Sequence, residues 1–450
     1  MAATMTAHVI VCSMPFVSHF TPMLTISRHL VDLGYQVTFI TSSKFCDKIQ
    51  NIGAAFAEPS GWGDFHDDTL ASKSQGAPTD PYARANWNVT TFFIKTIPAQ
   101  IEAIQSVITF SLASDPSKPI VVLPESSFHG ALPILLEAPG QRPNGIAHVG
   151  IFPILALSID TAPPASGILP SSSPEGQKRN EELNKTYVDL WGPMQRELNS
   201  TLASLGARGI EEYRHNAVIS LSDIFLQLCP PSLEYPRSDI PPSLRFTGGL
   251  PRDPPSVTHS TKDLPSWWSE IIQNSKKERK KIIAVSQGTM TLNYRDLIIP
   301  TLNALANSPD ILVLVALGKK GAALPEDFVV PGNARVADWI PFDDLLAVSD
   351  CFVTNGGYGS FQNSVSRGVP LVVAAPLFAD KRDIADRVEW SGVGIPLKTG
   401  TPSPDAVREA VLEVLEEGKY RRRVEEVRGE IRGFDPMKVI ADAVDELAGR

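Results

Sequence analysis

Apolar runs and helical periodicity alternate along the first part of the chain. Residues 7–13 (AHVIVCS) are almost continuously apolar, which is typical of a parallel strand buried on both faces. Thr21 and Pro22 read as an N-cap and a first-turn proline, so we expect a helix over 22–33. Residues 36–42 (QVTFITS) predict the next strand, and this strand–helix–strand order indicates a doubly wound parallel sheet. Further strands are expected at 119–123, 147–152 and 224–228.

The same alternation restarts after a stretch at 229–266 that is dense in proline and glycine, where neither a long helix nor an interior strand is expected. Later strands are predicted at 281–287, 311–317, 334–340, 350–355 and 370–375, with helices at 295–307, 359–367 and 382–391. The fold class that we infer is α/β, with two facing Rossmann-like doubly wound domains. The expected divisions are a first domain over 1–250, a linker over 251–278, a second domain over 279–432 and a C-terminal helix over 433–450 that returns to the first domain.

Composition narrows the class of protein. A hydrophobic content of 43%, a charged content of 20% and 38 prolines suit a globular protein with many loops. The formal charge of −9 disfavours nucleic acid and anionic membranes as partners. The scattered cysteines form no CxxC pair, so neither a zinc site nor a disulfide framework is supported. No apolar run reaches the roughly 18 residues that span a bilayer, and no secretory signal is recognised, so we expect a cytoplasmic protein without a membrane span.

A glycine-rich turn, 355–360 (NGGYGS), follows the predicted strand 350–355. Ligands of doubly wound sheets bind beyond the carboxyl ends of the strands. Gly356, Gly357 and Gly359 let backbone amides approach a ligand, and the helix that follows adds unpaired N–H donors. This combination suits a phosphate or diphosphate. For this segment alone, a tight turn without a ligand stays an equal alternative.

Other predicted strand ends carry complementary groups. Gly288 and the Thr289 hydroxyl end one strand, and Trp339 ends another, where its ring is a suitable platform for a planar base. The Asp380 carboxylate, after a further strand, could accept hydrogen bonds from sugar hydroxyls. Phosphate, base and hydroxyl partners at one sheet edge indicate a nucleotide-sugar.

With these residues in this order, the chain resembles the inverting glycosyltransferases of the UDP-glycosyltransferase superfamily, which have the two-Rossmann GT-B fold. The resemblance covers nearly the whole chain, is strongest over 281–397, and is greatest to fungal and bacterial members that act on small molecules in secondary metabolism. It implies that Trp339 stacks on uracil while the Ile340 backbone pairs with its edge. The implied diphosphate site comprises Gly288, Thr289, Asn355, Gly356, Gly357, Tyr358, Gly359 and Ser360.

The resemblance also implies that Asn363 faces the ribose and that Asp380 and Lys381 contact the sugar. The chain departs from the family pattern at several of these positions. Asn355 stands where many members have histidine, Asn363 stands where the plant-type box has glutamate, and Lys381 stands where that box has glutamine. The identity of the sugar, and the choice between UDP and dTDP, are therefore open at this point.

The acid–base group expected on the other domain is His19, in PFVSHFTPM after the first strand. An adjacent helix N-terminus disfavours imidazolium, so His19 should be neutral and able to accept a proton. The segment resembles the family's Gly-His-x-x-Pro motif with Ser18 in place of glycine. Glu125 occupies the place of the family's aspartate partner; the alternative is a solvated loop glutamate, with His19 acting alone or through water. His129 nearby is expected to be structural.

The implied reaction is a single displacement in which His19 removes the acceptor proton and UDP leaves, without a metal or other cofactor. A small lipophilic or phenolic acceptor and a nucleotide-sugar, most simply UDP-glucose, are the expected partners of a monomer or weak dimer. The acceptor pocket should use aromatic residues of the first domain, most of which could equally form core: Trp62, Phe65, Trp87, Phe92, Phe93, Phe128 and Phe152. The alternatives are a non-catalytic nucleotide-sugar-binding subunit of this fold, or an epimerase or hydrolase.

Overall fold

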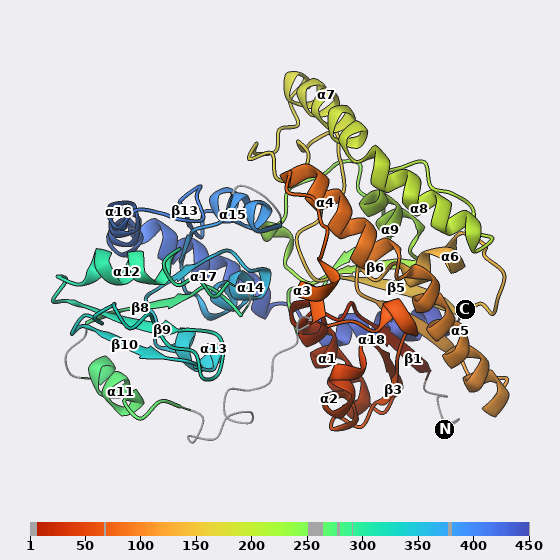
Figure 1. Cartoon of the computed structure of the whole chain (residues 1–450), viewed down its shortest axis with the longest axis horizontal. Coiled ribbons are helices and arrows are strands. Elements are labelled where there is room, and N and C mark those ends of the chain that lie inside the picture. The colour runs from red at the N-terminus through yellow and green to blue at the C-terminus, as the bar shows by residue number, and fades with distance from the viewer. Residues whose placement is uncertain are drawn as a thin grey trace.

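The computed structural model describes residues 7–66, 69–250, 264–276, 280–289, 291–376 and 380–449. Two α/β halves lie side by side, one formed by the first part of the chain and the other by the later part (Figure 1). Each half is built on a parallel sheet, with seven strands in the first and six in the second. The two doubly wound parallel sheets that the sequence predicted are therefore confirmed.

The first sheet has the order β3-β2-β1-β4-β5-β6-β7. Its strands are β1 (His8–Cys12), β2 (Gln36–Ile40), β3 (Ala55–Ala57), β4 (Ile120–Pro124), β5 (Gly145–Gly150), β6 (Ile224–Gln227) and β7 (Leu244–Phe246). Its α-helices are α1 (Val17–Asp32), α2 (Cys46–Gln50), α3 (Leu70–Lys73), α4 (Pro81–Val89), α5 (Ile97–Ser114), α6 (Leu132–Leu135), α7 (Pro174–Leu190), α8 (Gly192–Ser204) and α9 (Arg214–Leu221). Because β1 is followed by β2 on one side and flanked by β4 on the other, the chain changes direction across the sheet there, which makes β1/β4 the topological switch point.

The second sheet has the order β10-β9-β8-β11-β12-β13, so its switch point lies between β8 and β11. Its strands are β8 (Lys281–Ser286), β9 (Ile311–Ala316), β10 (Ala334–Ala337), β11 (Cys351–Thr354), β12 (Leu371–Val373) and β13 (Gly394–Pro396). Its α-helices are α11 (Trp268–Lys276), α12 (Ile298–Leu305), α13 (Phe342–Ala347), α14 (Tyr358–Arg367), α15 (Asp380–Ser391), α16 (Pro404–Glu416) and α17 (Gly418–Arg432). The last helix, α18 (Pro436–Ala448), packs against the first half instead.

The apolar run of β1 explains its place in the sheet. Val9 and Val11 pack in the core on one face, whereas Ile10 and Cys12 pack in the core on the other face. Successive side chains of a strand point to opposite faces, so a strand covered on both sides must be apolar throughout. The two-sided burial that the sequence predicted for this strand is therefore confirmed.

Helix α1 begins earlier than the sequence indicated. Its N-cap is Phe16 and it begins at Val17, so the predicted start at Pro22 is wrong. The Thr21 hydroxyl does not cap a helix but donates to the Val17 carbonyl one turn earlier, at 2.8 Å. His19 consequently lies in the first turn of α1 rather than in a preceding loop, which fixes its backbone.

Helix α18 packs against the first sheet, beside α1, although it follows the second half in the chain (Figure 1). Ile440, Ala443, Val444 and Leu447 are fully buried in the core that contains β1, β4 and β5. Of the predicted linker, 251–263 and 277–278 lie outside the described residues. Its described part contains α11, whose Trp268 and Ile271 pack in the core of the second half.

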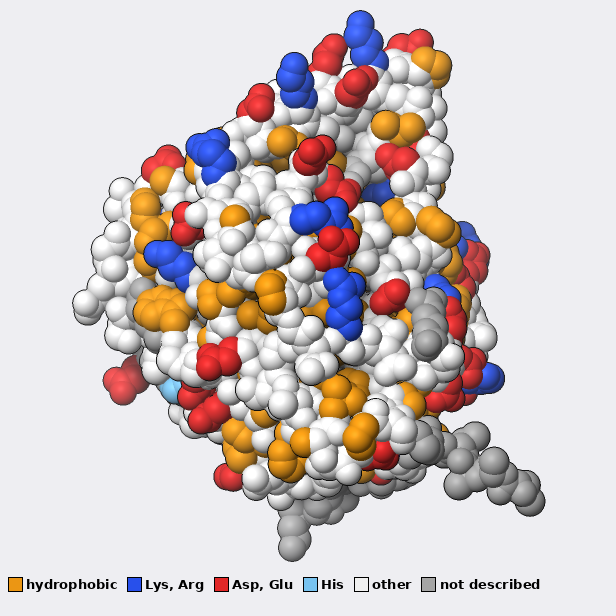
Figure 2. All heavy atoms as spheres, turned by 90° about the vertical axis from the view of Figure 1, so that its right-hand side faces the viewer, with side chains coloured by type: hydrophobic (Ala, Val, Ile, Leu, Met, Phe, Trp, Pro, Cys, Tyr) orange, Lys and Arg blue, Asp and Glu red, His pale blue; other side chains and the backbone are white. Residues whose placement is uncertain are grey.

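The outer face of the first half, which Figure 2 shows, carries apolar side chains interspersed with charged ones. The described helices include none with the length and apolar character needed to cross a bilayer.

Candidate active site

His19 and Glu125 lie on the two sides of the first switch point. His19 is in the first turn after β1, and Glu125 directly follows β4, the strand paired with β1. His19 Nδ1 lies 2.9 Å from Glu125 Oε1. A carboxylate can only accept, so this contact places the ring proton on Nδ1 and leaves Nε2 as the proton acceptor.

Glu125 is held rigidly. The backbone N–H of Met14 donates to Oε1 at 3.2 Å, and the backbone N–H of Ser127 donates to Oε2 at 2.6 Å. The carboxylate is fully buried, whereas the His19 side chain is 17% exposed. Burying a carboxylate is costly unless hydrogen bonds satisfy it, and here both oxygens are satisfied. The pair therefore presents one accessible imidazole nitrogen on a fixed support.

Three aromatic rings lie around the His19 side chain. The ring centroids of Phe16, Phe152 and Phe93 lie 5.3, 6.2 and 6.4 Å from that of His19. These rings come from the N-cap of α1, the segment after β5 and the π-helical turn at Thr90–Ile94. Phe16 was missed as a candidate because it sits within the histidine motif rather than in a long loop.

The other aromatic candidates mostly form core or scaffold. Phe65, Phe92 and Phe128 are buried in the core beneath β1, and Trp87 packs against the same cluster. The Trp62 indole N–H donates to the Thr91 carbonyl at 2.8 Å. Of the seven residues singled out from the sequence, only Phe93 and Phe152 have ring contacts with His19 among the described residues.

His129 is fully buried, and burial, followed by the Arg214 and His148 charges, lowers its pKa well below the usual value. A neutral ring in the interior is consistent with the structural part expected of it.

The donor edge predicted for the second half begins at the end of β8. Gly288 has φ = +75°, and its carbonyl oxygen would lie 2.3 Å from a Cβ at Gly318, which follows β9. Any side chain at Gly318 would therefore force these strand ends apart. The sequence signal for Gly318, a glycine just after an apolar run, was present but was not used. Thr289, next to Gly288, is exposed.

The glycine turn connects β11 to α14. Gly356 has φ = +81°, a conformation that L side chains rarely adopt, and an added Cβ would lie 3.1 Å from Val373 Cγ1. Gly357 is the N-cap of α14 with φ = −68°, and an added Cβ there would meet only Ser360 Oγ, at 3.7 Å. Gly359 is exposed and has open space at its Cβ position. The N-terminus of α14 therefore leaves room beside Gly357 and Gly359, which a ligand site at a helix N-terminus also needs.

Asn355 makes an internal contact that the sequence did not indicate. Its amide nitrogen donates to the Gln287 carbonyl and, at 3.2 Å, to Thr291 Oγ1. The side chain thus ties the end of β11 to the segment after β8. A phosphate contact through this amide would require one of these bonds to break.

Tyr358, the first residue of α14, reaches the first half of the molecule. Its hydroxyl accepts a hydrogen bond at 3.2 Å from Gln227 Nε2, and the same nitrogen donates to the Phe152 carbonyl at 3.0 Å. Gln227 is fully buried at the end of β6. Burial, followed by the nearby Cys229, raises the pKa of Tyr358 well above its usual value. Gln227 therefore connects Tyr358, at the glycine turn, with Phe152, whose ring lies beside His19. The sequence did not indicate this role of Gln227.

The remaining candidates lie around this edge. Trp339 follows β10 with 39% of its surface exposed, while Ile340 is buried beneath it. Asn363 and Ser360 are half-buried on α14. The Asp380 side chain lies outside the described residues, although its backbone begins α15. The Lys381 carbonyl would lie 3.3 Å from a Cβ at Gly356, so the start of α15 lies against the glycine turn.

Within the described part of the chain, no cluster of three or more His, Cys, Asp or Glu side chains is arranged to hold a metal ion.

Comparison with known proteins identifies full-length relatives. Residues 302–446 match the family described as erythromycin biosynthesis protein CIII-like, C-terminal domain. The chain is 34% identical over 444 residues to UDP-glucosyltransferase B1 of Starmerella bombicola, covering 98% of both chains. It is 37% identical over 457 residues to UDP-glycosyltransferase 2 of Phaeomoniella chlamydospora, covering 99% of this chain and 97% of the relative.

Solved structures share the fold. The glycotransferase of kitacinnamycin aligns with a TM-score of 0.71 at 20% identity, over 98% of this chain and 99% of that one. The calicheamicin glycosyltransferase CalG4 aligns with a TM-score of 0.65 at 18% identity, over 99% of both chains.

Proposed function

The chain belongs to the UDP-glycosyltransferase family and is a glycosyltransferase, and from this premise we propose that it moves glucose from UDP-glucose onto a hydroxyl of a small lipophilic or phenolic acceptor. The reaction inverts the anomeric centre, and His19 is the base. The observation that carries this proposal is the 2.9 Å contact between His19 and the buried carboxylate of Glu125 at the switch point of the first sheet.

In the proposed reaction, His19 Nε2 takes the proton of the acceptor hydroxyl. The resulting oxygen nucleophile forms a bond to the anomeric carbon in line with the bond to UDP, which breaks and leaves with its electron pair. Glu125 keeps the ring in the required tautomer and stabilises the imidazolium as it forms. An α-linked donor gives a β-glycoside.

The leaving diphosphate is stabilised by the N-terminus of α14. The backbone amides of Gly357, Tyr358 and Gly359 precede or begin that helix, where unpaired N–H groups and the helix dipole favour negative charge. The open space at Gly357 and Gly359 supports this assignment. These amides can supply the charge stabilisation that a metal ion supplies in other transferases. Trp339 is proposed as the stacking surface for uracil.

The acceptor is proposed to lie among Phe16, Phe93 and Phe152, with its hydroxyl at His19. Apolar rings on several sides suit a flat or lipophilic molecule that buries its carbon skeleton and exposes one hydroxyl to the base. In this arrangement the first half, 1–250, binds the acceptor, and the second half, 279–432, binds the donor.

A donor and acceptor panel tests the proposal. The purified protein is incubated with UDP-glucose, other UDP-sugars and dTDP-glucose, each with mixed phenols and lipophilic alcohols, and the products are identified by mass spectrometry and the anomer by NMR. A β-glucoside formed from UDP-glucose is the expected product. Free glucose without glucoside would identify a hydrolase, and donor binding without turnover would identify a non-catalytic binding protein.

A further inference from the structure

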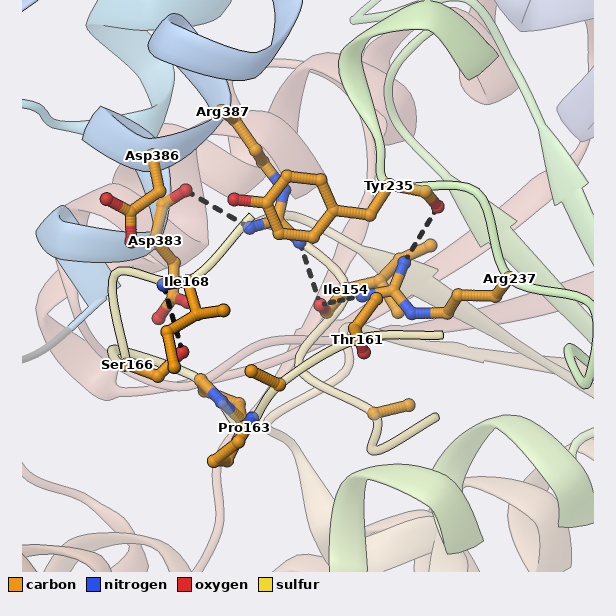
Figure 3. Close-up of a pocket in the computed structure, with 13 residues that line it drawn as sticks. Ile154, Thr161, Pro163, Ser166, Ile168, Tyr235, Arg237, Asp383, Asp386 and Arg387 are labelled. Carbon is orange, nitrogen blue, oxygen red and sulfur yellow. Dashed lines mark hydrogen bonds between the residues drawn. The ribbon is translucent and has the colours of Figure 1, made fainter. Parts of the chain in front are cut away.

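Helix α15 is joined to the first half of the molecule by a buried arginine, Arg387 (Figure 3). Its side chain is 2% exposed, although it carries a permanent charge. The Arg387 guanidinium donates to Glu234 Oε2 from Nε at 3.0 Å and from Nη2 at 2.8 Å. Nη2 also donates to the Ile154 carbonyl at 2.9 Å, and Nη1 donates to the carbonyl of Asp383 at 3.1 Å. One residue of the second half therefore has partners on two separate segments of the first.

The surroundings of Arg387 are built to hold this one geometry. The Tyr235 ring lies beneath the guanidinium, with 4.5 Å between the charge centre and the ring centroid. Glu234 Oε1 accepts from the Ile154 backbone N–H at 2.9 Å, so Glu234 and Arg387 bind the two sides of the same residue. Arg237 Nη2 also donates to the Ile154 carbonyl, at 3.0 Å. Burial lowers the pKa of Arg387, but the charge and hydrogen bonds of Glu234 together with the nearby Tyr235 and Asp383 outweigh it, and the net effect raises the pKa.

A second contact joins the same elements. The backbone N–H of Ala165, in the long segment that follows Ile154, donates to Asp383 Oδ1 at 2.9 Å. Asp383 lies one turn before Arg387 on α15 and is buried. Two successive turns of α15 are thus fixed to the segment 154–165 of the first half; Figure 3 shows the Arg387–Ile154 bond of this pair.

Helix α15 and segment 154–165, which these contacts join, lie next to opposite sides of the proposed site. Ile154 lies two residues after Phe152, whose ring contacts that of His19. On the donor side, α15 begins with Asp380 and Lys381, just before Asp383. The Lys381 backbone lies against Gly356 of the glycine turn. The separation between the base and the donor sugar therefore depends on how α15 sits on segment 154–165.

We propose that Arg387 is a positioning residue: with Glu234 and the Ile154 carbonyl, it sets the distance between the donor sugar held at the start of α15 and the acceptor held at His19. This inference rests on the proposed function. It predicts that loosening the contact impairs transfer while leaving nucleotide binding intact, because the turn and α14, which bind the diphosphate, make none of the Arg387 contacts described above. A shift of about 1 Å in a reacting pair can lower turnover on the order of 100-fold.

Arg387→Lys is the variant of choice, because lysine keeps the charge beside Glu234 but has only three donors on one nitrogen, whereas the guanidinium makes four bonds from three nitrogens. We expect kcat for transfer to fall roughly 10- to 100-fold, and more of the donor to appear as free glucose per glucoside formed. The Kd of UDP, measured by calorimetry, should stay within about twofold. The matched control is Arg335→Lys, which changes a similar two-nitrogen contact with Glu270 inside the second half, at 2.9 and 3.1 Å. It should leave kcat unchanged.

A second measurement does not depend on turnover. Hydrogen–deuterium exchange with UDP bound should be faster in Arg387→Lys over α15 and segment 154–165, and unchanged in β8 and β11. If kcat stays within twofold of the parent, or falls only in proportion to UDP affinity and melting temperature, Arg387 does not position the reactants. If the parent enzyme transfers no sugar, the proposed function fails first, and unchanged exchange in α15 would still overturn the role of Arg387.

Discussion

The proposed chemistry depends most directly on the imidazole of His19. Removing it in His19→Ala should lower turnover by roughly 10²–10⁴-fold, the usual contribution of a general base. UDP affinity should change little, because the glycine turn and Trp339 belong to the other half. The assay should use an aliphatic alcohol, since a phenol ionises readily and can react without a base. Undiminished turnover of the alcohol would rule out His19 as the base.

Glu125 can be tested separately from His19. In Glu125→Gln, the single amide oxygen can replace only one carboxylate oxygen, so either the Ser127 N–H or both the Met14 N–H and His19 Nδ1 lose their acceptor. An amide N–H facing Nδ1 would also shift the ring proton to Nε2, where the acceptor proton must go. We expect turnover to fall on the order of 10²–10⁴-fold, with UDP affinity retained. Glu125→Asp keeps the charge and should retain more activity; equal activity in all three proteins would show that His19 needs no carboxylate.

Asn363 is the residue through which nucleotide choice can be tested. An amide accepts hydrogen bonds only through its oxygen, whereas a carboxylate could accept from both ribose hydroxyls. A charge-assisted bond contributes about 1.5–3 kcal/mol, or roughly ten- to a hundredfold in affinity. Asn363→Glu should therefore sharpen the preference for UDP over dTDP by up to that factor in competitive titrations. An unchanged preference in a protein that already selects UDP would mean that Asn363 does not face the ribose.

Two adjacent glycines at the N-terminus of α14 should respond differently to substitution, one in UDP binding and the other in stability. Gly357→Ala should fold normally, because its φ of −68° suits any residue and its Cβ meets only Ser360 Oγ at 3.7 Å. The added methyl group should nevertheless weaken UDP binding if the diphosphate lies against this amide. Gly356→Ala should instead destabilise the fold by about 1–2 kcal/mol, because φ is +81° and Val373 is close. Calorimetry measures the loss of UDP affinity, and melting curves measure the loss of stability. Full UDP affinity in Gly357→Ala would mean that the diphosphate does not bind at this turn.

Which elements the sequence could predict depends on how local their causes are. The long buried strands β1, β8 and β9 follow from continuous apolar runs, and the order of strands and helices follows from their alternation. The strands β3, β7 and β13 were missed because each has three residues at or near a sheet edge, too few to show a pattern.

The same limit applies inside the candidate site. The predicted start of α1 was wrong because threonine is a common N-cap residue, whereas the Thr21 hydroxyl donates to the Val17 carbonyl inside the helix. The contacts Asn355–Gln287, Gln227–Tyr358 and Arg387–Glu234 join residues far apart in the chain. Motif spacing carries no information about such pairs: the first depends on how β8 and β11 pair within the second sheet, and the other two depend on how the two halves are placed.

At the scale of the whole molecule, the two halves place the ends of their central strands on facing sides of the site. His19 and Glu125 follow strands of the first sheet, and the glycine turn follows β11 of the second. Gln227 and Arg387 connect these ends from opposite halves. These two contacts therefore fix the position of each half relative to the other, and the proposed transfer depends on that position.

The C-terminal helix gives a test of how the ends of the chain cooperate. Leu447 of α18 is fully buried in the core of the first half, and its Cβ would lie 2.8 Å from a Cβ at Gly145 of β5. Leu447→Ala should therefore lower the free energy of unfolding of the first half by about 2–5 kcal/mol, the usual cost of a buried leucine. Hydrogen–deuterium exchange should accelerate in β4 and β5 but not in β8 or β11, and UDP affinity should persist. Lys438→Ala on the same helix, at a side chain that is 66% exposed, is the control and should change none of these. If exchange instead accelerated in β8 and β11, the stability of the second half would depend on α18, contrary to its packing against the first sheet.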